Sequence, residues 1–100
     1  MIKHIVIWTL KDEFSEDEAR DACLKAKEIL EDLNGKIDGM HELEVGIDFS
    51  KTEASGDFVL YSTFESKQAL DAYQEDPLHL AVKPYIGSIR KTRQVIDYEI

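Results

Sequence analysis

Two segments of the chain, residues 2–10 and 57–65, have the length and the β-branched and aromatic content of β-strands and carry little charge on either alternating face. In the first segment the two sets of side chains are Ile2, His4, Val6, Trp8 and Leu10, and Lys3, Ile5, Ile7 and Thr9. In the second, Phe58, Leu60 and Phe64 point one way, and Val59, Tyr61 and Thr63 the other. Strands with this pattern are covered above and below, so both belong in the middle of a sheet.

Two further strand-like segments have a polar face. Residues 43–49 alternate apolar side chains with acidic ones and glycine, and residues 89–100 mix basic and apolar residues, so both are expected at sheet edges.

Helices are predicted between these strands. Ser15 and Glu18 form a capping-box pattern, an apolar stripe at spacings of three and four follows, and Asn34-Gly35 supplies the stop. Ser66 is expected to cap a short helix that runs through Tyr73. Asp76-Pro77 starts another helical piece, which we expect Pro84 and Gly87 to end; these lie in the stretch before the last strand.

The order of elements is therefore βαββαβ. Right-handed crossovers that each leave room for one strand place strands one and three in the middle and strands two and four at the edges. The expected fold is α+β and ferredoxin-like, with a four-stranded antiparallel sheet.

The two helices of this βαββαβ order can cover only one face of such a sheet. Whichever set of side chains of the central strands lies away from them is too apolar to remain in water. We therefore expect a homodimer in which two open sheet faces pack together into a shared α/β barrel and bury more than about 1,000 Å².

Composition limits the partners. One hundred residues are sufficient for a single domain, residues 1–100, and a formal charge of −9 disfavours nucleic acid and anionic membranes. The basic cluster Arg90, Lys91 and Arg93 is typical of a solvated strand edge. No segment has the pattern of a signal peptide or a membrane span, and the lone Cys23 falls on an apolar helix stripe, so we expect a soluble, cytoplasmic protein with a packed thiol.

Short segments along nearly the whole chain resemble the stress-responsive A/B barrel family, often called Dabb. They are Lys3-His4-Ile5-Val6, Lys11-Asp12-Glu13, Gly46-Ile47-Asp48, Phe64-Glu65-Ser66 before Tyr73, Pro77-Leu78-His79 and Ile96-Asp97-Tyr98. The resemblance implies a dimeric ferredoxin-like α/β barrel. The family includes stress-induced plant proteins, bacterial proteins of unassigned role and a plant polyketide cyclase that works without a cofactor.

The resemblance also implies three candidate catalytic residues. His4, Tyr73 and His79 match positions that line the cyclase pocket, whereas another pocket histidine of the cyclase is replaced near Asp57. Aldol ring closure needs a base that removes a proton beside a carbonyl and a donor that stabilises the enolate oxygen. His79 is the candidate base, Tyr73 the candidate donor, and His4 the residue that orients the substrate. Contact between Tyr73 and His79 depends on the turn at Asp76-Pro77.

Other interpretations remain open at this point. We expect a small homodimeric protein of this family with an unassigned biochemical role and a potential small-molecule cavity between sheet and helices. The cofactor-independent cyclase or lyase is the alternative to a non-catalytic stress or binding protein in which these side chains only pack. Trp8 allows a cofactor-free monooxygenase, although a lone tryptophan on a central strand is typical of a core. His4, His41 and His79 lie in three separate elements, so no metal site and no cofactor are expected. A cavity of about 300 Å³ or more beside His4 and His79 favours the enzyme.

Overall fold

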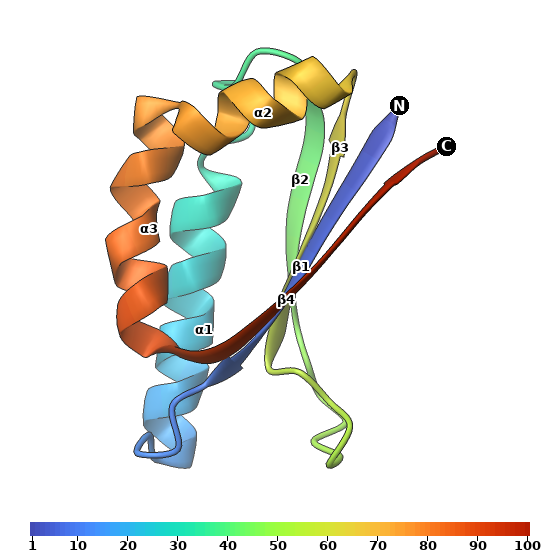
Figure 1. The fold of residues 1–100 in the computed structure, drawn as a ribbon. Coiled ribbons are helices and arrows are strands. Elements are labelled where there is room, and N and C mark those ends of the chain that lie inside the picture. Colours follow the sequence, from blue (N-terminus) through green and yellow to red (C-terminus); the bar gives the residue numbers. More distant parts are fainter.

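The computed structural model describes residues 1–100 as a four-stranded antiparallel sheet with three helices on one face (Figure 1). The elements are β1 (Ile2–Leu10), α1 (Glu16–Glu31), β2 (Met40–Ile47), β3 (Phe58–Phe64), α2 (Lys67–Glu75), α3 (Pro77–Ile89) and β4 (Arg90–Glu99). The strand order is β2-β3-β1-β4, so the predicted ferredoxin-like sheet, with strands one and three in the middle, is confirmed.

The register of β1 fixes which side chains face the helices. His4 lies opposite Ser62 of β3 and Asp97 of β4, and Val6 lies opposite Leu60 and Val95. Side chains of β1 on this face are buried in the core together with those of β3. The cavity described below lies over the same face.

The first crossover forms as its sequence predicts. The Ser15 hydroxyl accepts a hydrogen bond from the Glu18 N–H, and the Glu18 carboxylate accepts one from the Ser15 N–H, which completes the capping box that starts α1. Along α1, Ala22, Cys23, Ala26 and Leu30 are buried. The Cys23 thiol is packed in the core as expected, and burial raises its pKa.

The second crossover contains two helices. Asp76 has an extended backbone (φ −65°, ψ 130°) between α2 and α3, and its carboxylate accepts a hydrogen bond from the Leu78 N–H. Pro77 occupies the first turn of α3, where its missing N–H costs nothing. The chain therefore changes direction at Asp76 and starts α3 beside the end of α2.

The predicted end of this helix at Pro84 and Gly87 is wrong, because α3 continues to Ile89. Proline within a helix costs about 3 kcal/mol. Beyond it, Ile86 and Ile89 are buried against the core, and burying each such side chain contributes about 1.5–3 kcal/mol. Pro84 itself is exposed, and a Cβ at Gly87 would meet no other heavy atom within 4 Å.

The other face of the sheet has no helix over it (Figure 1). Ile5, Ile7, Val59 and Tyr61 all lie on this face by register. On β4, Ile96 and Tyr98 continue it and are 58% and 44% exposed. We call this surface, together with its polar neighbours Lys3, Glu42 and Thr63, the open face.

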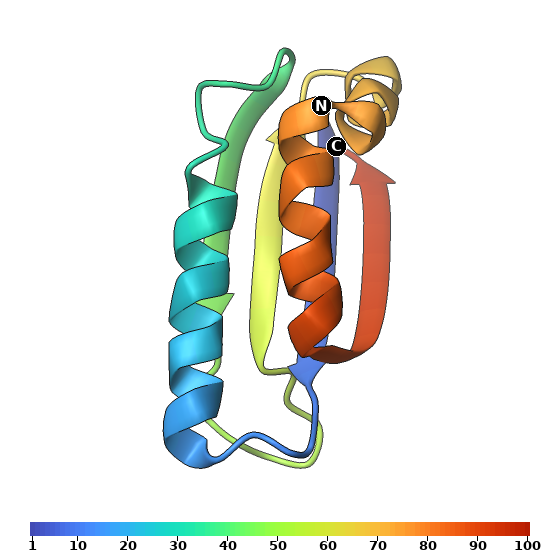
Figure 2. The same ribbon diagram turned by 90° about the vertical axis from the view of Figure 1, so that its left-hand side faces the viewer.

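Strand β4 lies beyond α3, with no helix over most of its length (Figure 2). All ten of its residues are exposed, so the space between sheet and helices is accessible from this side. None of the three helices has the length and apolar character needed to span a membrane.

Candidate functional site

A cavity of about 440 Å³ lies between the sheet and the helices. Its walls come from β1, β3 and β4 on one side and from α1, α2 and α3 on the other. His4, Tyr73 and His79, which the family resemblance brought together, all line it. The volume exceeds the threshold of about 300 Å³ at which a small ligand fits.

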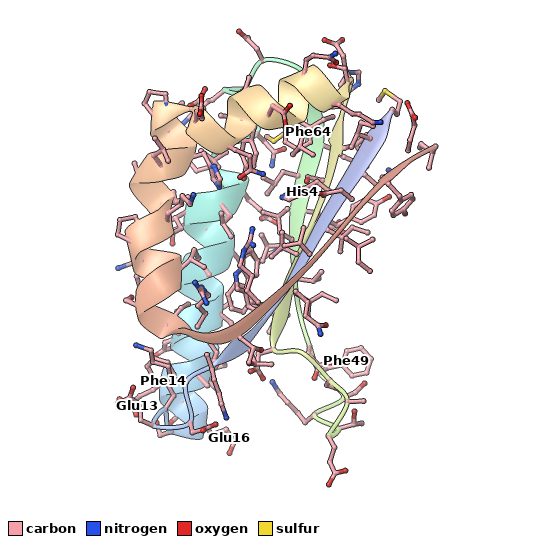
Figure 3. The ribbon with its side chains drawn as sticks, viewed as in Figure 1. His4, Glu13, Phe14, Glu16, Phe49 and Phe64 are labelled. Atoms are coloured by element: carbon pink, nitrogen blue, oxygen red, sulfur yellow. The ribbon has the colours of Figure 1, made fainter.

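His4 projects from β1 into the space between sheet and helices (Figure 3). Its side chain is 4% exposed, and its Nδ1 lies 2.5 Å from Oδ1 of Asp97 on the neighbouring edge strand. Because a carboxylate only accepts hydrogen bonds, Nδ1 carries a proton. In the neutral ring the remaining nitrogen, Nε2, is then an acceptor.

Tyr73 and His79 are brought together by the turn at Asp76. Their rings stack with centroids 3.9 Å apart and an interplanar angle of 19°. The His79 Nδ1–H donates to the Tyr73 backbone carbonyl oxygen at 3.0 Å. This bond fixes the tautomer, since the carbonyl can only accept, and it leaves the His79 Nε2 lone pair free.

The surroundings of His79 favour its neutral form. Burial is the main cause that lowers its pKa from 6.5, and its electrostatic interactions with Lys83, His4 and Arg93 lower it further, whereas the hydrogen bond to Tyr73 opposes them. A histidine with a lowered pKa is neutral at pH 7. His79 is therefore a base with an unprotonated Nε2 under physiological conditions.

Tyr73 is held as a neutral phenol. It is 1% exposed, and burial raises its pKa well above the ordinary value of 10.0. Its ring is tilted against Phe64 at 5.0 Å and meets the His4 ring edge-on at 6.2 Å. At neutral pH the hydroxyl keeps its proton and can donate a hydrogen bond.

Trp8 is a core residue that also lines the cavity. It is 5% exposed, and its ring stacks on Phe58 at 4.7 Å. The indole Nε1–H is buried and has no hydrogen-bond partner in the protein. An unsatisfied buried donor costs about 1–3 kcal/mol, which an acceptor in the adjoining cavity can recover.

The remaining candidates lie outside the cavity. His41 is exposed on β2, 3.8 Å from Glu65, and no three His, Cys, Asp or Glu side chains converge on a point that could hold a metal ion. Asp57 has a structural role, because its carboxylate accepts a hydrogen bond from the Leu10 N–H at 2.7 Å and its own N–H donates to the Trp8 carbonyl oxygen.

Sequence reasoning missed three cations that line the cavity and the carboxylate that holds one of its histidines. Arg90 and Arg93 are exposed, as expected for a solvated strand edge. Both also line the cavity, as does Lys83. Asp97 was not recognised as the partner of His4. The alternation of β4 contains this signal: Arg93 and Asp97 are four residues apart and share the face of β4 that lies beside His4.

The chain is similar to several known proteins. The chain is 32% identical to an uncharacterised protein of Streptomyces coelicolor over 81 residues, 81% of each chain. A dimeric ferredoxin-like protein of unknown function from Bacteroides fragilis is 29% identical, with a TM-score of 0.90 over 99% of this chain and 95% of that one. The hydroxynitrile lyase of Passiflora edulis shares the fold at 20% identity and a TM-score of 0.75, over 99% and 92% of the two chains.

The sequence model of one family, the Stress responsive A/B Barrel Domain or Dabb, matches residues 2–100. This match confirms the family resemblance of the short segments along the chain. The protein therefore belongs to the stress responsive A/B barrel domain family.

Proposed function

We propose that the protein is a cofactor-independent enzyme that removes a proton from the carbon beside a carbonyl group, as in a polyketide cyclase or a lyase. The observation that carries the proposal is the pairing of His79 with Tyr73 beside a cavity of about 440 Å³. A neutral histidine with a fixed tautomer and a protonated phenol supply the base and the donor that this chemistry needs.

In the proposed step, the His79 Nε2 lone pair takes the proton of the C–H bond. The electron pair of that bond moves to form an enolate, and the negative oxygen accepts a hydrogen bond from the Tyr73 hydroxyl. The enolate carbon can then attack a second carbonyl, and the protonated His79 returns its proton to the resulting alkoxide. His4, fixed by Asp97, lines the same cavity and orients the substrate.

The cavity favours proton transfer over the alternative of a cofactor-free monooxygenase. Trp8 is packed on Phe58 in the core, and nothing else in the cavity favours oxygen chemistry over proton transfer. A non-catalytic binding protein would use the same cavity but would have no use for the fixed His79 tautomer. A measurement of proton exchange distinguishes the proton-transfer enzyme from a binding protein.

The test is deuterium exchange at the carbons beside the carbonyl of 4-phenylbutan-2-one, a neutral ketone, followed by NMR in D₂O. The wild-type protein should accelerate exchange. His79→Gln should reduce the acceleration by about 10²–10⁴-fold, and Tyr73→Phe by about 10²–10³-fold. His41→Gln, the same change at an exposed histidine, should leave it intact. Exchange by His79→Gln equal to that of His41→Gln would contradict the proposal.

We also propose that a second copy of the chain covers the open face. The Bacteroides fragilis relative is described as dimeric, and Ile96 and Tyr98 extend an apolar surface that the helices leave uncovered. A pair of such faces gives the closed barrel that the sequence predicts. The single buried cysteine fits a cytoplasmic location, which stays a prediction.

A further inference from the structure

The charges that line the cavity are opposite in sign to the charge of the molecule. The chain has 21 acidic and 12 basic residues, yet the cavity lining includes Lys83, Arg90 and Arg93 and no Asp or Glu. Lys83, Arg90 and Arg93 are exposed at the open side of the cavity, and a cleft lined by one sign of charge concentrates ligands of the other sign. The excess of positive charge is therefore confined to this site and is opposite in sign to the net charge of the whole protein.

These three cations are not neutralised within the protein. The lysines and arginines that form ion pairs lie elsewhere, and they are Lys3, Arg20, Lys27, Lys36 and Lys91. The nearest carboxylate by strand register, that of Asp97, is engaged by His4. The cavity therefore presents positive charge that no side chain of the chain satisfies.

Position in the fold directs two of the cations at the candidate reactive groups. Arg93 lies opposite Trp8 in the β1–β4 register, on the sheet face that carries His4. Lys83 follows His79 by four residues in α3, so the two share a helix face. The charges of both residues act on His79, and that of Arg93 also acts on Tyr73.

The rest of the cavity lining is suited to the apolar part of a ligand. Val6 and Leu60 come from the sheet and Val82 and Ile86 from α3. The buried Trp8 Nε1–H, which has no partner in the chain, adds an unfilled donor at a residue of the same lining. A ligand with an apolar part and oxygen acceptors matches both features.

We infer that the cavity selects small organic carboxylates, with Arg93 and Lys83 holding the carboxylate and the apolar side chains of β1, β3 and α3 holding the body of the molecule. This inference rests on the proposed function, since it names the substrate class of the same cavity. The substrate of the proton transfer is then a carbonyl compound that also carries a carboxylate.

The test compares two probes of nearly the same shape, 4-phenylbutanoate and its neutral amide 4-phenylbutanamide, by calorimetric titration at low salt. The acid should bind at least about tenfold more tightly, because its hydrogen bonds to Arg and Lys are charge-assisted. Arg93→Gln should remove most of this preference. Arg20→Gln makes the same change of net charge on α1, where Arg20 pairs with Asp17, and should leave the preference unchanged. Added KCl should weaken binding of the acid more than that of the amide.

Equal affinity for the acid and the amide, or an unchanged preference in Arg93→Gln, would overturn the inference. The proposed function is tested separately with a neutral ketone, so the two can fail independently. Ketone exchange that depends on His79, without a preference for the acid, removes only the carboxylate inference. A preference for the acid that depends on Arg93, without exchange of either the neutral ketone or 4-oxo-4-phenylbutanoate, a ketone that carries a carboxylate, removes only the proton-transfer proposal.

Discussion

Among the single residues, His79 has three features that together set its chemistry. It is partly buried, its Nδ1–H is committed to the Tyr73 carbonyl oxygen, and it faces cations from two different elements, Lys83 on α3 and Arg93 on β4. The first and third lower its pKa, while the second fixes the tautomer that leaves Nε2 unprotonated. Basicity and orientation are thus set by separate contacts.

This arrangement predicts the pH dependence of ketone exchange. Burial, Lys83, His4 and Arg93 lower the pKa of His79 below 6.5 against the opposing hydrogen bond to Tyr73, so activity should be full at pH 7 and fall only as the pH drops below 6.5. Arg93→Gln removes one of these charges and should move the midpoint of the acid limb of kcat/KM upward. Arg20→Gln should leave the midpoint in place. A midpoint above 6.5 in the wild-type protein would contradict the environment described here.

Part of the cavity could be predicted from the sequence. His4, Tyr73 and His79 were singled out through family resemblance, and all three line one cavity. The contact between Tyr73 and His79 could not be derived, because a separation of six residues fits no helix face and depends on the backbone angles at Asp76. Arg93 was assigned to a solvated edge, since strand alternation alone does not say which face of an edge strand meets a cavity.

At the scale of elements, the free edge of β2 is closed by side chains from α1 and the turn after it. Asn34 accepts from the Leu43 N–H at 3.0 Å and donates to the Leu43 carbonyl oxygen at 2.8 Å. Glu31 accepts from the Val45 N–H and Lys27 donates to the Val45 carbonyl oxygen. These contacts occupy the backbone groups that an exposed edge strand would offer to another chain.

Asn34→Ala should therefore destabilise the fold and expose an edge. Two hydrogen bonds to Leu43 are lost, which corresponds to a decrease of about 1–3 kcal/mol in the free energy of unfolding. Urea denaturation followed by circular dichroism measures the loss. Asp32→Ala, which removes only the exposed ion pair with Lys36, is the matched control and should change stability by less than about 1 kcal/mol. Equal stability of the two variants would show that the Asn34 contacts do not stabilise the edge.

Glu31 adds a pH dependence to the same edge. Its hydrogen bond with Lys27 is the main cause that lowers its pKa from 4.5, and the bond from the Val45 N–H lowers it further. A carboxyl group whose pKa is lower in the folded state stabilises the fold above its unfolded pKa, and this contribution is lost as the pH falls through the folded value. Glu31→Gln should accordingly lower the Tm at pH 7, and the difference from wild type should shrink below pH 4.5. A constant difference from pH 7 to pH 3 would contradict this assignment.

The ends of the helices show where tertiary packing outweighs local sequence patterns. The capping box at Ser15 and the start at Asp76-Pro77 formed as predicted, because each depends on contacts within one turn. The end of α3 did not, because Ile86 and Ile89 reach the core beyond Pro84. Local patterns thus located the starts of these helices, whereas tertiary packing decided where α3 ends.

At the scale of the whole molecule, the two faces of the sheet differ in how they are covered. The helices bury the face that carries His4, while the open face keeps Ile7, Ile96 and Tyr98 at 36%, 58% and 44% exposure. Sequence patterns predicted this asymmetry, because two strands that are apolar on both sides exceed what helices on one side can cover. They could not show that Lys3, Glu42 and Thr63 form a hydrogen-bonded cluster at one end of the open face.

The proposed dimer predicts the mass of the protein in solution. The wild-type protein should have a mass of twice 11.5 kDa by light scattering at micromolar concentration. Ile96→Glu places a charge beside Ile5, on the β4 side of the open face, where a packed partner would desolvate it, and should weaken association by at least about tenfold. Leu24→Glu puts the same charge on an apolar residue of α1 that is 50% exposed, and should leave the dimer intact. Circular dichroism should show both variants folded, since Ile96 is exposed in the single chain. If the wild type is a monomer, or if Ile96→Glu associates as tightly as Leu24→Glu, the open face is not the surface on which two copies meet.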